Sequence, residues 1–171
     1  MSDLTNESEL VALAKSGDSE ALGQLWEQFT PKLFGYLVNT LKDKTLAEDI
    51  LQSTWLKAVN ALPNFEYNNF SAWMFAIARN EMNQHWRKKQ PESVEEFAVE
   101  PSGDDREKID SRLTVEKLLS GLTNEEAEII RLKYIADLPI SEIAKILKIN
   151  QVAARVRIHR TLKKAESLVK Q

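Results

Sequence analysis

Cysteine is absent from this chain of 171 residues, and glycine and proline are scarce, with five of each. The lack of cysteine excludes disulfides and thiolate metal sites, and it makes a reducing cytoplasm the expected compartment. The scarcity of glycine and proline, without stretches of β-branched alternation, favours an all-α fold. No apolar run approaches the roughly 20 residues of a membrane-spanning helix, and the acidic N-terminus lacks the apolar segment of a secretory signal. We therefore expect no membrane insertion.

The sequence also lacks the motifs of the common enzyme classes. It contains no glycine-rich phosphate loop, no HExxH pattern and no cysteine nucleophile. Its two histidines, His85 and His159, fall in different predicted domains, and its carboxylates stand where they suit helix caps and solvated faces. We expect a protein that is not an enzyme and that needs neither a cofactor nor a metal ion.

Helical periodicity and capping signals run through most of the chain. Gly17 suits the residue after a helix and Asp18 the N-cap of the next helix. Two capping-box patterns, TLAE at 45–48 and TNEE at 123–126, mark further helix starts. The second helix either continues through Pro31 or restarts after it. With their capping residues, the expected helices cover residues 8–16, 18–37, 45–61, 71–89, 111–120, 123–134, 139–147 and 150–170.

Charge is distributed unevenly along the chain. Within a net charge of −3, residues 91–110 carry −6 and residues 111–171 carry +5. The acidic segment has two prolines and no helical period, which is typical of a linker. We therefore expect two small helical domains, residues 1–90 and 111–171, joined by a flexible linker over residues 91–110. A basic module on an acidic tether is typical of DNA-binding proteins, but chance clustering on solvated helices explains the charge alone equally well.

The end of the chain has the form of a helix-turn-helix: a short helix from Pro139, a turn of three or four residues, and a longer basic helix capped by Asn150. At about 100° per residue, one face of the longer helix should pack on the preceding helices: Ala154, Ile158, Thr161, Leu162, Ala165 and Leu168. The opposite face and its flank should enter the major groove: Arg155, Val156, Arg157, His159, Arg160 and Lys163. Arginine offers a planar donor fork to guanine or phosphate. The alternative is a solvated amphipathic helix at the end of a bundle.

Three segments resemble one protein family, and they occur in the order found in that family. The segment LPISEIAKILKINQVAARVRIHRTL, residues 138–162, resembles the helix-turn-helix with which extracytoplasmic-function sigma factors read the −35 promoter element. AEDILQSTWLKAV, residues 47–59, resembles their polymerase-clamp helix, and FSAWMFAIARNEMNQHWRKK, residues 70–89, resembles their −10 recognition and melting helix. A helix-turn-helix alone is unspecific, but the three segments together are highly specific.

The resemblance implies a set of partners. They are core RNA polymerase, bound through the clamp helices of its β′ subunit and the flap of its β subunit, promoter DNA, and an anti-sigma factor. The polymerase-binding residues that it implies are Asp49, Gln52, Ser53 and Trp55. Trp55 serves this interface as an aromatic anchor, or it belongs to the domain core, and both are compatible with the sequence.

The loop of residues 63–69, PNFEYNN, occupies the place where the family holds a base flipped from the −10 element. The implied −10 residues are Asn64, Phe65, Tyr67, Asn68, Arg79, Asn80, Gln84, Arg87 and Lys88. The loop rings would stack on a base and the asparagines would bond its edge, unless the rings fill the domain core instead. The chain departs from the family at Gln84 and Ser53, where carboxylates are usual or common, and at Val152-Ala153, where Gly-Thr is usual.

The expected function is promoter-specific initiation of transcription, in which the protein brings core RNA polymerase to a promoter, reads the −35 duplex and melts and reads the −10 element. The alternative is a stand-alone helix-turn-helix regulator with a helical sensor domain, which would bind duplex DNA without polymerase. The segments 47–59 and 70–89 favour the sigma factor, because a sensor domain would not need them.

Overall fold

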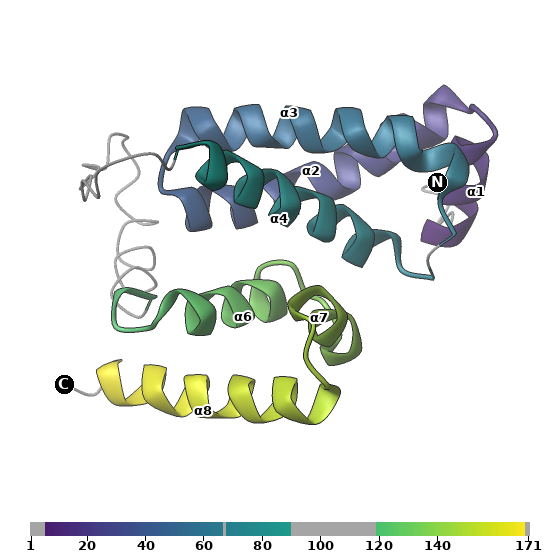
Figure 1. Ribbon diagram of the computed structural model, residues 1–171. Helices are drawn as coiled ribbons and strands as arrows, with labels where there is room; N and C mark the ends of the chain where they lie inside the picture. Colours follow the sequence, from purple (N-terminus) through teal and green to yellow (C-terminus); the bar gives the residue numbers. More distant parts are fainter. Residues whose placement is uncertain (1–5, 67, 90–118, 170–171) are drawn as a thin grey trace. The chain divides into compact units, whose positions relative to one another are not determined.

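The computed structural model describes residues 6–66, 68–89 and 119–169, and within these ranges the chain forms helices and no strand (Figure 1). The all-α prediction is confirmed. The chain divides into two compact units, residues 1–95 and 96–171. The expected linker over 91–110 lies outside the described residues, as does the expected helix over 111–120 apart from its last two residues. The expected boundaries at residues 90 and 111 therefore stay a prediction.

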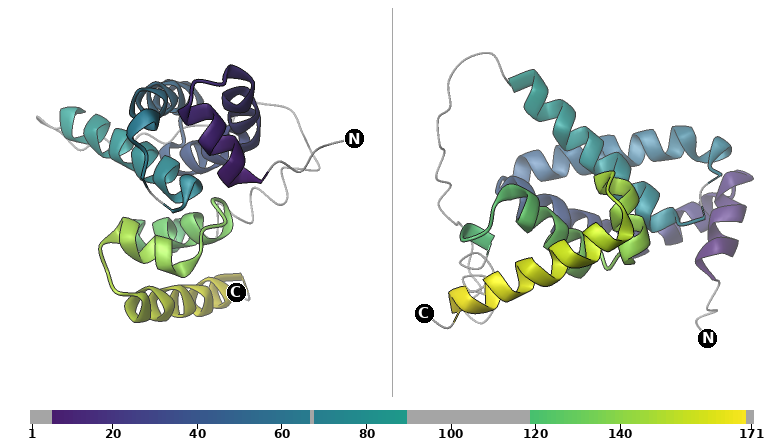
Figure 2. Two further views of the ribbon diagram at one scale, coloured as in Figure 1. Left: turned by 90° about the vertical axis from the view of Figure 1, so that its right-hand side faces the viewer. Right: turned by 60° about the horizontal axis from the view of Figure 1, so that its bottom comes forward.

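The N-terminal unit is a small helical bundle. Its described elements are α1 (Glu7–Lys15), α2 (Ser19–Leu41), α3 (Lys44–Ala61), the short 3-10 turn η1 (Leu62–Asn64) and α4 (Phe70–Lys89). α3 packs against α2 and α4, and α1 crosses one end of the long helices (Figures 1 and 2). Leu25, Leu33, Tyr36 and Phe75 are fully buried between them. The rings of Tyr36 and Phe75 meet edge to face with centroids 5.4 Å apart, a favoured aromatic geometry.

The corner between α1 and α2 is held by its own backbone and one carboxylate. Gly17 has a φ of 95°, a conformation open to glycine at no steric cost. The Asp18 carboxylate then accepts hydrogen bonds from the backbone N–H of Glu20 at 2.9 Å and of Ala21 at 3.0 Å. Because two of the otherwise unpaired N–H groups at the start of α2 are thus satisfied, the predicted stop and start at this corner are confirmed.

Two sequence expectations about the following helices are resolved by the structure. α2 continues through Pro31 as one helix of 23 residues. The expected N-cap of α3 at Thr45 is wrong, because the helix begins at Lys44 and Asp43 is its cap, accepting from Leu46 N at 3.0 Å. Lys42, in the left-handed region at φ 57°, ends α2 immediately before this cap. The turn is therefore only two residues long, and the carboxylate at its end pairs one of the free N–H groups at the start of α3.

The C-terminal unit contains the helix-turn-helix. Its described helices are α6 (Asn124–Tyr134), α7 (Ile140–Leu147) and α8 (Gln151–Val169). Thr123 and Glu126 form the predicted capping box, and Asn150 caps α8 by accepting from Ala153 N at 2.7 Å. Pro139 is the N-cap of α7 and not its first helical residue. The core of this unit is aliphatic and is built from Ile129, Leu132, Leu138, Ile143 and Ala154.

Two kinds of feature are missing from the part of the chain that the structure describes. None of its helices is both long and apolar enough to cross a membrane. Nor does this part contain a cluster of three His, Asp or Glu side chains placed to hold a metal ion.

Replacement of Asp18 by alanine should destabilise the N-terminal unit, because α2 would lose its capping acceptor. The expected loss in the free energy of unfolding is about 1 kcal/mol. Asp18→Asn should retain most of the stability of the wild type, because asparagine is also a good N-cap. All four tryptophans lie in residues 26–86, so urea unfolding followed by tryptophan fluorescence reports on this unit. Equal midpoints for the alanine variant and the wild type would contradict the capping role.

Candidate functional site

A mostly cationic face covers the first three turns of α8. Arg155, Arg157, His159, Arg160 and Lys163 are all exposed, and Val156 is 41% exposed among them. Ala154, Ile158 and Thr161 are buried on the opposite side, so the predicted division of the helix into a packing face and a free face is confirmed over these turns. The prediction fails at Leu168, which is partly exposed near the end of the helix. Its side chain lies beside Gly121, where an added Cβ would meet it.

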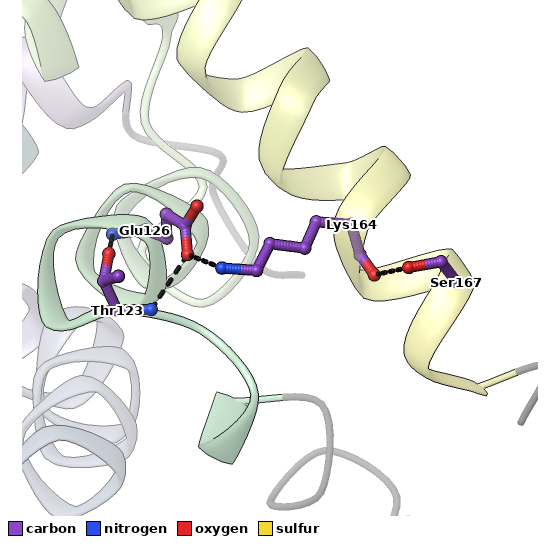
Figure 3. Close-up of polar contacts among 4 residues, drawn as sticks. All are labelled: Thr123, Glu126, Lys164 and Ser167. Atoms are coloured by element: carbon purple, nitrogen blue, oxygen red, sulfur yellow. Dashed lines mark hydrogen bonds and ion pairs between the residues drawn. The ribbon is translucent and has the colours of Figure 1, made fainter.

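Charged contacts with α6 hold the later part of α8 in place (Figure 3). The Lys164 ammonium donates to the Glu126 carboxylate at 2.7 Å, and the same carboxylate accepts from the backbone N–H of Thr123 at 2.8 Å. These two hydrogen bonds, that of Lys164 being the stronger influence, lower the pKa of Glu126. Lys164 is therefore engaged within the unit.

Arg157 makes a weaker contact with the same helix. Its guanidinium lies 3.9 Å from the Glu125 carboxylate, and both side chains are well exposed. An exposed pair at this distance contributes little to stability. Arg157 is thus free to exchange this carboxylate for a phosphate, in contrast to Lys164.

The outer face of α3 carries the expected polar residues but not the expected aromatic anchor. Asp49 and Gln52 are exposed. Trp55 is only 2% exposed, and its ring lies 4.7 Å, centroid to centroid, from that of Trp26 on α2. Of the two interpretations of Trp55 that the sequence left open, the domain core is therefore confirmed, because this side chain fills the interface between α2 and α3. Ser53 is half-buried, and its hydroxyl donates to Glu81 on α4.

Three apolar side chains that were not predicted to be functional are exposed on α2 and α3. Leu56 is 65% exposed, Trp26 is 42% exposed, and Val59 is also exposed. Leu56 follows Gln52 by four residues and Asp49 by seven, so it continues the stripe of these two polar residues along α3. This spacing alone is enough to predict that Leu56 lies on the same exposed face of α3. Trp26 had no such signal, because its exposure depends on how Trp55 packs beneath it.

A charged cluster joins α3 to α4. The Glu81 side chain is 9% exposed, and its carboxylate accepts hydrogen bonds from the Lys57 ammonium and the Ser53 hydroxyl. Burial alone would raise the pKa of Glu81, but the hydrogen bonds from Lys57 and Ser53 and the nearby lysine charges outweigh it, so the net pKa is lowered. Glu81 therefore stays ionised and links α3, which carries Asp49 and Gln52, to α4, which carries Asn80.

The loop between η1 and α4 is anchored by an aromatic cluster. Phe65 is 7% exposed, and its ring contacts those of Phe70 at 5.6 Å and Trp73 at 4.8 Å. Of the two interpretations of Phe65 that the sequence left open, the filling of the domain core is therefore confirmed, because the ring is buried against Phe70 and Trp73. Asn64 and Asn68 are exposed, and Tyr67 lies outside the described residues.

The rest of the predicted −10 surface lies along α4. Asn80, Gln84, Arg87 and Lys88 are exposed, and Arg79 is half-buried. Trp86, which is not among the predicted −10 residues, is also exposed near the three cations that end the helix. The structure thus gathers cations, amides and one aromatic ring along α4, a composition suited to a DNA strand.

Comparison with known families decides what these surfaces belong to. The model of sigma-70 region 2 matches residues 25–92, and that of sigma-70 region 4 matches residues 112–164. The chain belongs to the sigma-70 family. Its relatives place it among the extracytoplasmic-function sigma factors, which are non-catalytic initiation factors, and it acts with core RNA polymerase in promoter-specific initiation of transcription.

Two curated relatives illustrate the similarity. The ECF RNA polymerase sigma factor BldN of Streptomyces coelicolor is 26% identical over 95% of this chain, which spans 65% of the length of BldN. The ECF RNA polymerase sigma factor SigW of Bacillus subtilis is 27% identical over 85% of this chain and 87% of its own length.

Solved structures agree with this sigma factor assignment. CnrH, solved in complex with the cytosolic domain of CnrY, matches with a TM-score of 0.72 and 26% identity, covering 94% of this chain and 95% of CnrH. The sigma factor RpoE from Bartonella quintana, solved with the anti-sigma factor NepR, shares the fold with a TM-score of 0.70 and 24% identity, over 87% of this chain and 96% of RpoE.

Replacement of Glu81 by glutamine should destabilise the N-terminal unit by about 1–2 kcal/mol at neutral pH, because Lys57 loses its partner but is half exposed and solvated. Since folding lowers the pKa of Glu81 below its ordinary value of 4.5, the contribution is complete above that value and is lost as the pH falls through the folded pKa. The gap in unfolding free energy between wild type and variant should therefore shrink on acidification.

The matched control is Glu48→Gln, which removes an exposed carboxylate 4.0 Å from Lys44 one turn away. This variant should lose only a few tenths of a kcal/mol. Urea titrations between about pH 7 and pH 3 measure both gaps, and a pH-independent gap for Glu81→Gln would contradict the assigned role of its charge.

Proposed function

We propose that the exposed polar and apolar stripe of α3 binds the β′ clamp helices of core RNA polymerase. Asp49, Gln52 and Leu56 form this stripe, and the resemblance of residues 47–59 to the family's clamp helix supports the assignment. An apolar side chain flanked by a carboxylate and an amide has the composition of an interface centre with a polar rim. The C-terminal unit would contact the flap of the β subunit, a role carried over from the family.

In the same proposal, α8 reads the −35 duplex and α4, with the loop before it, reads the melted −10 element. The cationic face of α8, exposed and opposite a buried face, is the observation that carries this function. Arg155 and Arg160 are the candidates for base contacts, and Arg157 and Lys163 for phosphates. In the loop, Asn64 and Asn68 would bond the edge of a flipped base. The protein would work in the cytoplasm without catalysis of its own.

An inhibitory protein partner completes the proposal. CnrH, the solved relative at 26% identity, was crystallised with the cytosolic domain of CnrY. Leu56 and Trp26 on the N-terminal unit and Val156 on the C-terminal unit are exposed apolar side chains that such a partner would cover. Trp55 is not available for this role because it is buried.

Arg155→Ala and Arg160→Ala should each weaken initiation at a cognate promoter while leaving the fold intact, because both side chains are exposed. For an arginine that reads a base, the loss should be about 1–3 kcal/mol and should depend on the base pair opposite it. Run-off transcription with core polymerase on a promoter library with randomised −35 positions measures both effects.

Lys133→Ala is the control, since it removes the same charge from α6, and its effect should not depend on −35 sequence. Equal loss on all −35 sequences would reassign an arginine to phosphate contact. No loss for either arginine would refute the groove placement. Tight, sequence-specific binding by the chain without polymerase would favour a stand-alone regulator.

A further inference from the structure

The last residue of α1 reaches across the N-terminal unit to the loop before α4. The Lys15 ammonium donates a hydrogen bond to the backbone carbonyl of Phe65 at 2.5 Å, a contact between residues 50 positions apart that is partly buried. The packing of α1 against η1 brings the two segments together. Lys15 thus supplies a charged donor to the Phe65 carbonyl.

Phe65 is held through both its backbone and its ring. Its N–H donates to Leu62 O at 3.0 Å, its carbonyl accepts from Lys15, and its ring packs against Phe70 and Trp73. Four residues later the Asn69 side chain accepts from Ala72 N at 2.8 Å and so caps the start of α4. The backbone is therefore held at Phe65, directly after Asn64, and at Asn69, directly after Asn68.

The position of Lys15 itself is also fixed. α1 ends at Lys15, and the Gly17 turn and the Asp18 cap lock the corner that follows. The corner therefore fixes the backbone from which the lysine side chain extends, although the residue is exposed. A hydrogen bond from a charged group is stronger than one between neutral partners.

We propose that Lys15 is a positioning residue that sets the direction of the loop and thereby the preference for bases of the −10 element. This inference rests on the proposed −10 role of Asn64 and Asn68. Asn64 immediately precedes Phe65, and Asn68 immediately precedes the Asn69 cap. In this scheme a shift of the Phe65 carbonyl displaces the loop that carries both amides. Lys15 acts through the backbone of Phe65 and makes no contact with DNA in this scheme.

The test uses the full chain with core RNA polymerase and a pool of promoter fragments randomised over the −10 element. Lys15→Met keeps a side chain of similar length but removes the donor, and Lys15→Arg keeps a charged donor. Lys32→Met makes the same chemical change at an exposed position of α2 and is the control. Selected sequences give the preference at each −10 position, and thermal unfolding and competition for core polymerase are measured on the same proteins.

Lys15→Met should lower the preference for the favoured base by about threefold to tenfold, as expected when a charged hydrogen bond that positions a reader is lost. The affected positions should be those at which Asn64→Ala and Asn68→Ala also act. Lys15→Arg should stay within about twofold of wild type. Polymerase affinity and the −35 preference should not change for any of the lysine variants.

Two results would overturn the inference. One is an unchanged −10 preference in Lys15→Met, and the other is a loss of activity that follows the thermal midpoint without any change in preference, which would make Lys15 a structural tie only. If Asn64→Ala and Asn68→Ala leave every −10 preference unchanged, the proposed reading by this loop fails, and that outcome is distinguishable from a failure of Lys15 alone.

Discussion

Each helix that offers a functional surface also supplies the core of its unit, and this double use limits which side chains can face outward. α3 buries Leu51, Trp55 and Ala58 between its neighbours, so that Asp49, Gln52 and Leu56 remain for a partner. α8 buries Ala154, Ile158 and Thr161, and its arginines are left on the other side. In units this small, there is no second layer to relieve this constraint. The period of 3.6 residues therefore selects the functional face together with the core.

The sequence was sufficient where the cause of a feature is local. The caps at Asp18, Thr123 and Asn150 follow from side chains that reach backbone groups two or three residues away. The two faces of α8 follow from its own spacing. The cap of α3 was misplaced by two residues because Asp43 and Thr45 are both good caps, and the short turn after Lys42 decided between them.

The sequence was insufficient where exposure depends on a distant partner. The sequence left undecided whether Trp55 and Phe65 lie in the core or at the surface. Contacts with other segments decide it, with Trp26 in the first case and with Phe70 and Trp73 in the second. Glu81 gave no signal at all, since its partners Ser53 and Lys57 lie 28 and 24 residues earlier on another helix. The domain limits and Tyr67 fall outside the described residues and are not tested.

The same physical distinction separates two kinds of cation on α8. Lys164 binds the Glu126 carboxylate, which the capping box already orients. The lysine charge therefore serves to hold α8 against α6. Arg157 faces the more exposed Glu125 at 3.9 Å, where water screens the attraction. A DNA phosphate would compete poorly for the first cation and well for the second. The surface of α8 that we propose for DNA therefore ends where the cations of the helix are bound by carboxylates of their own unit.

If the loop before α4 reads the −10 element as proposed, the burial of Phe65 also has a function. A ring that is packed against Phe70 and Trp73 is not available to stack on a base, but it fixes the backbone from which Asn64 and Asn68 project. Recognition by a loop is weakened by the entropy of ordering it, and a side chain on a backbone that is already held, as at Asn64 beside Phe65, avoids part of that loss. Polar side chains on a fixed backbone can also reject a wrong base, because they cannot adjust to it. Aromatic packing in the core and selectivity at the surface are thus two consequences of the same contact.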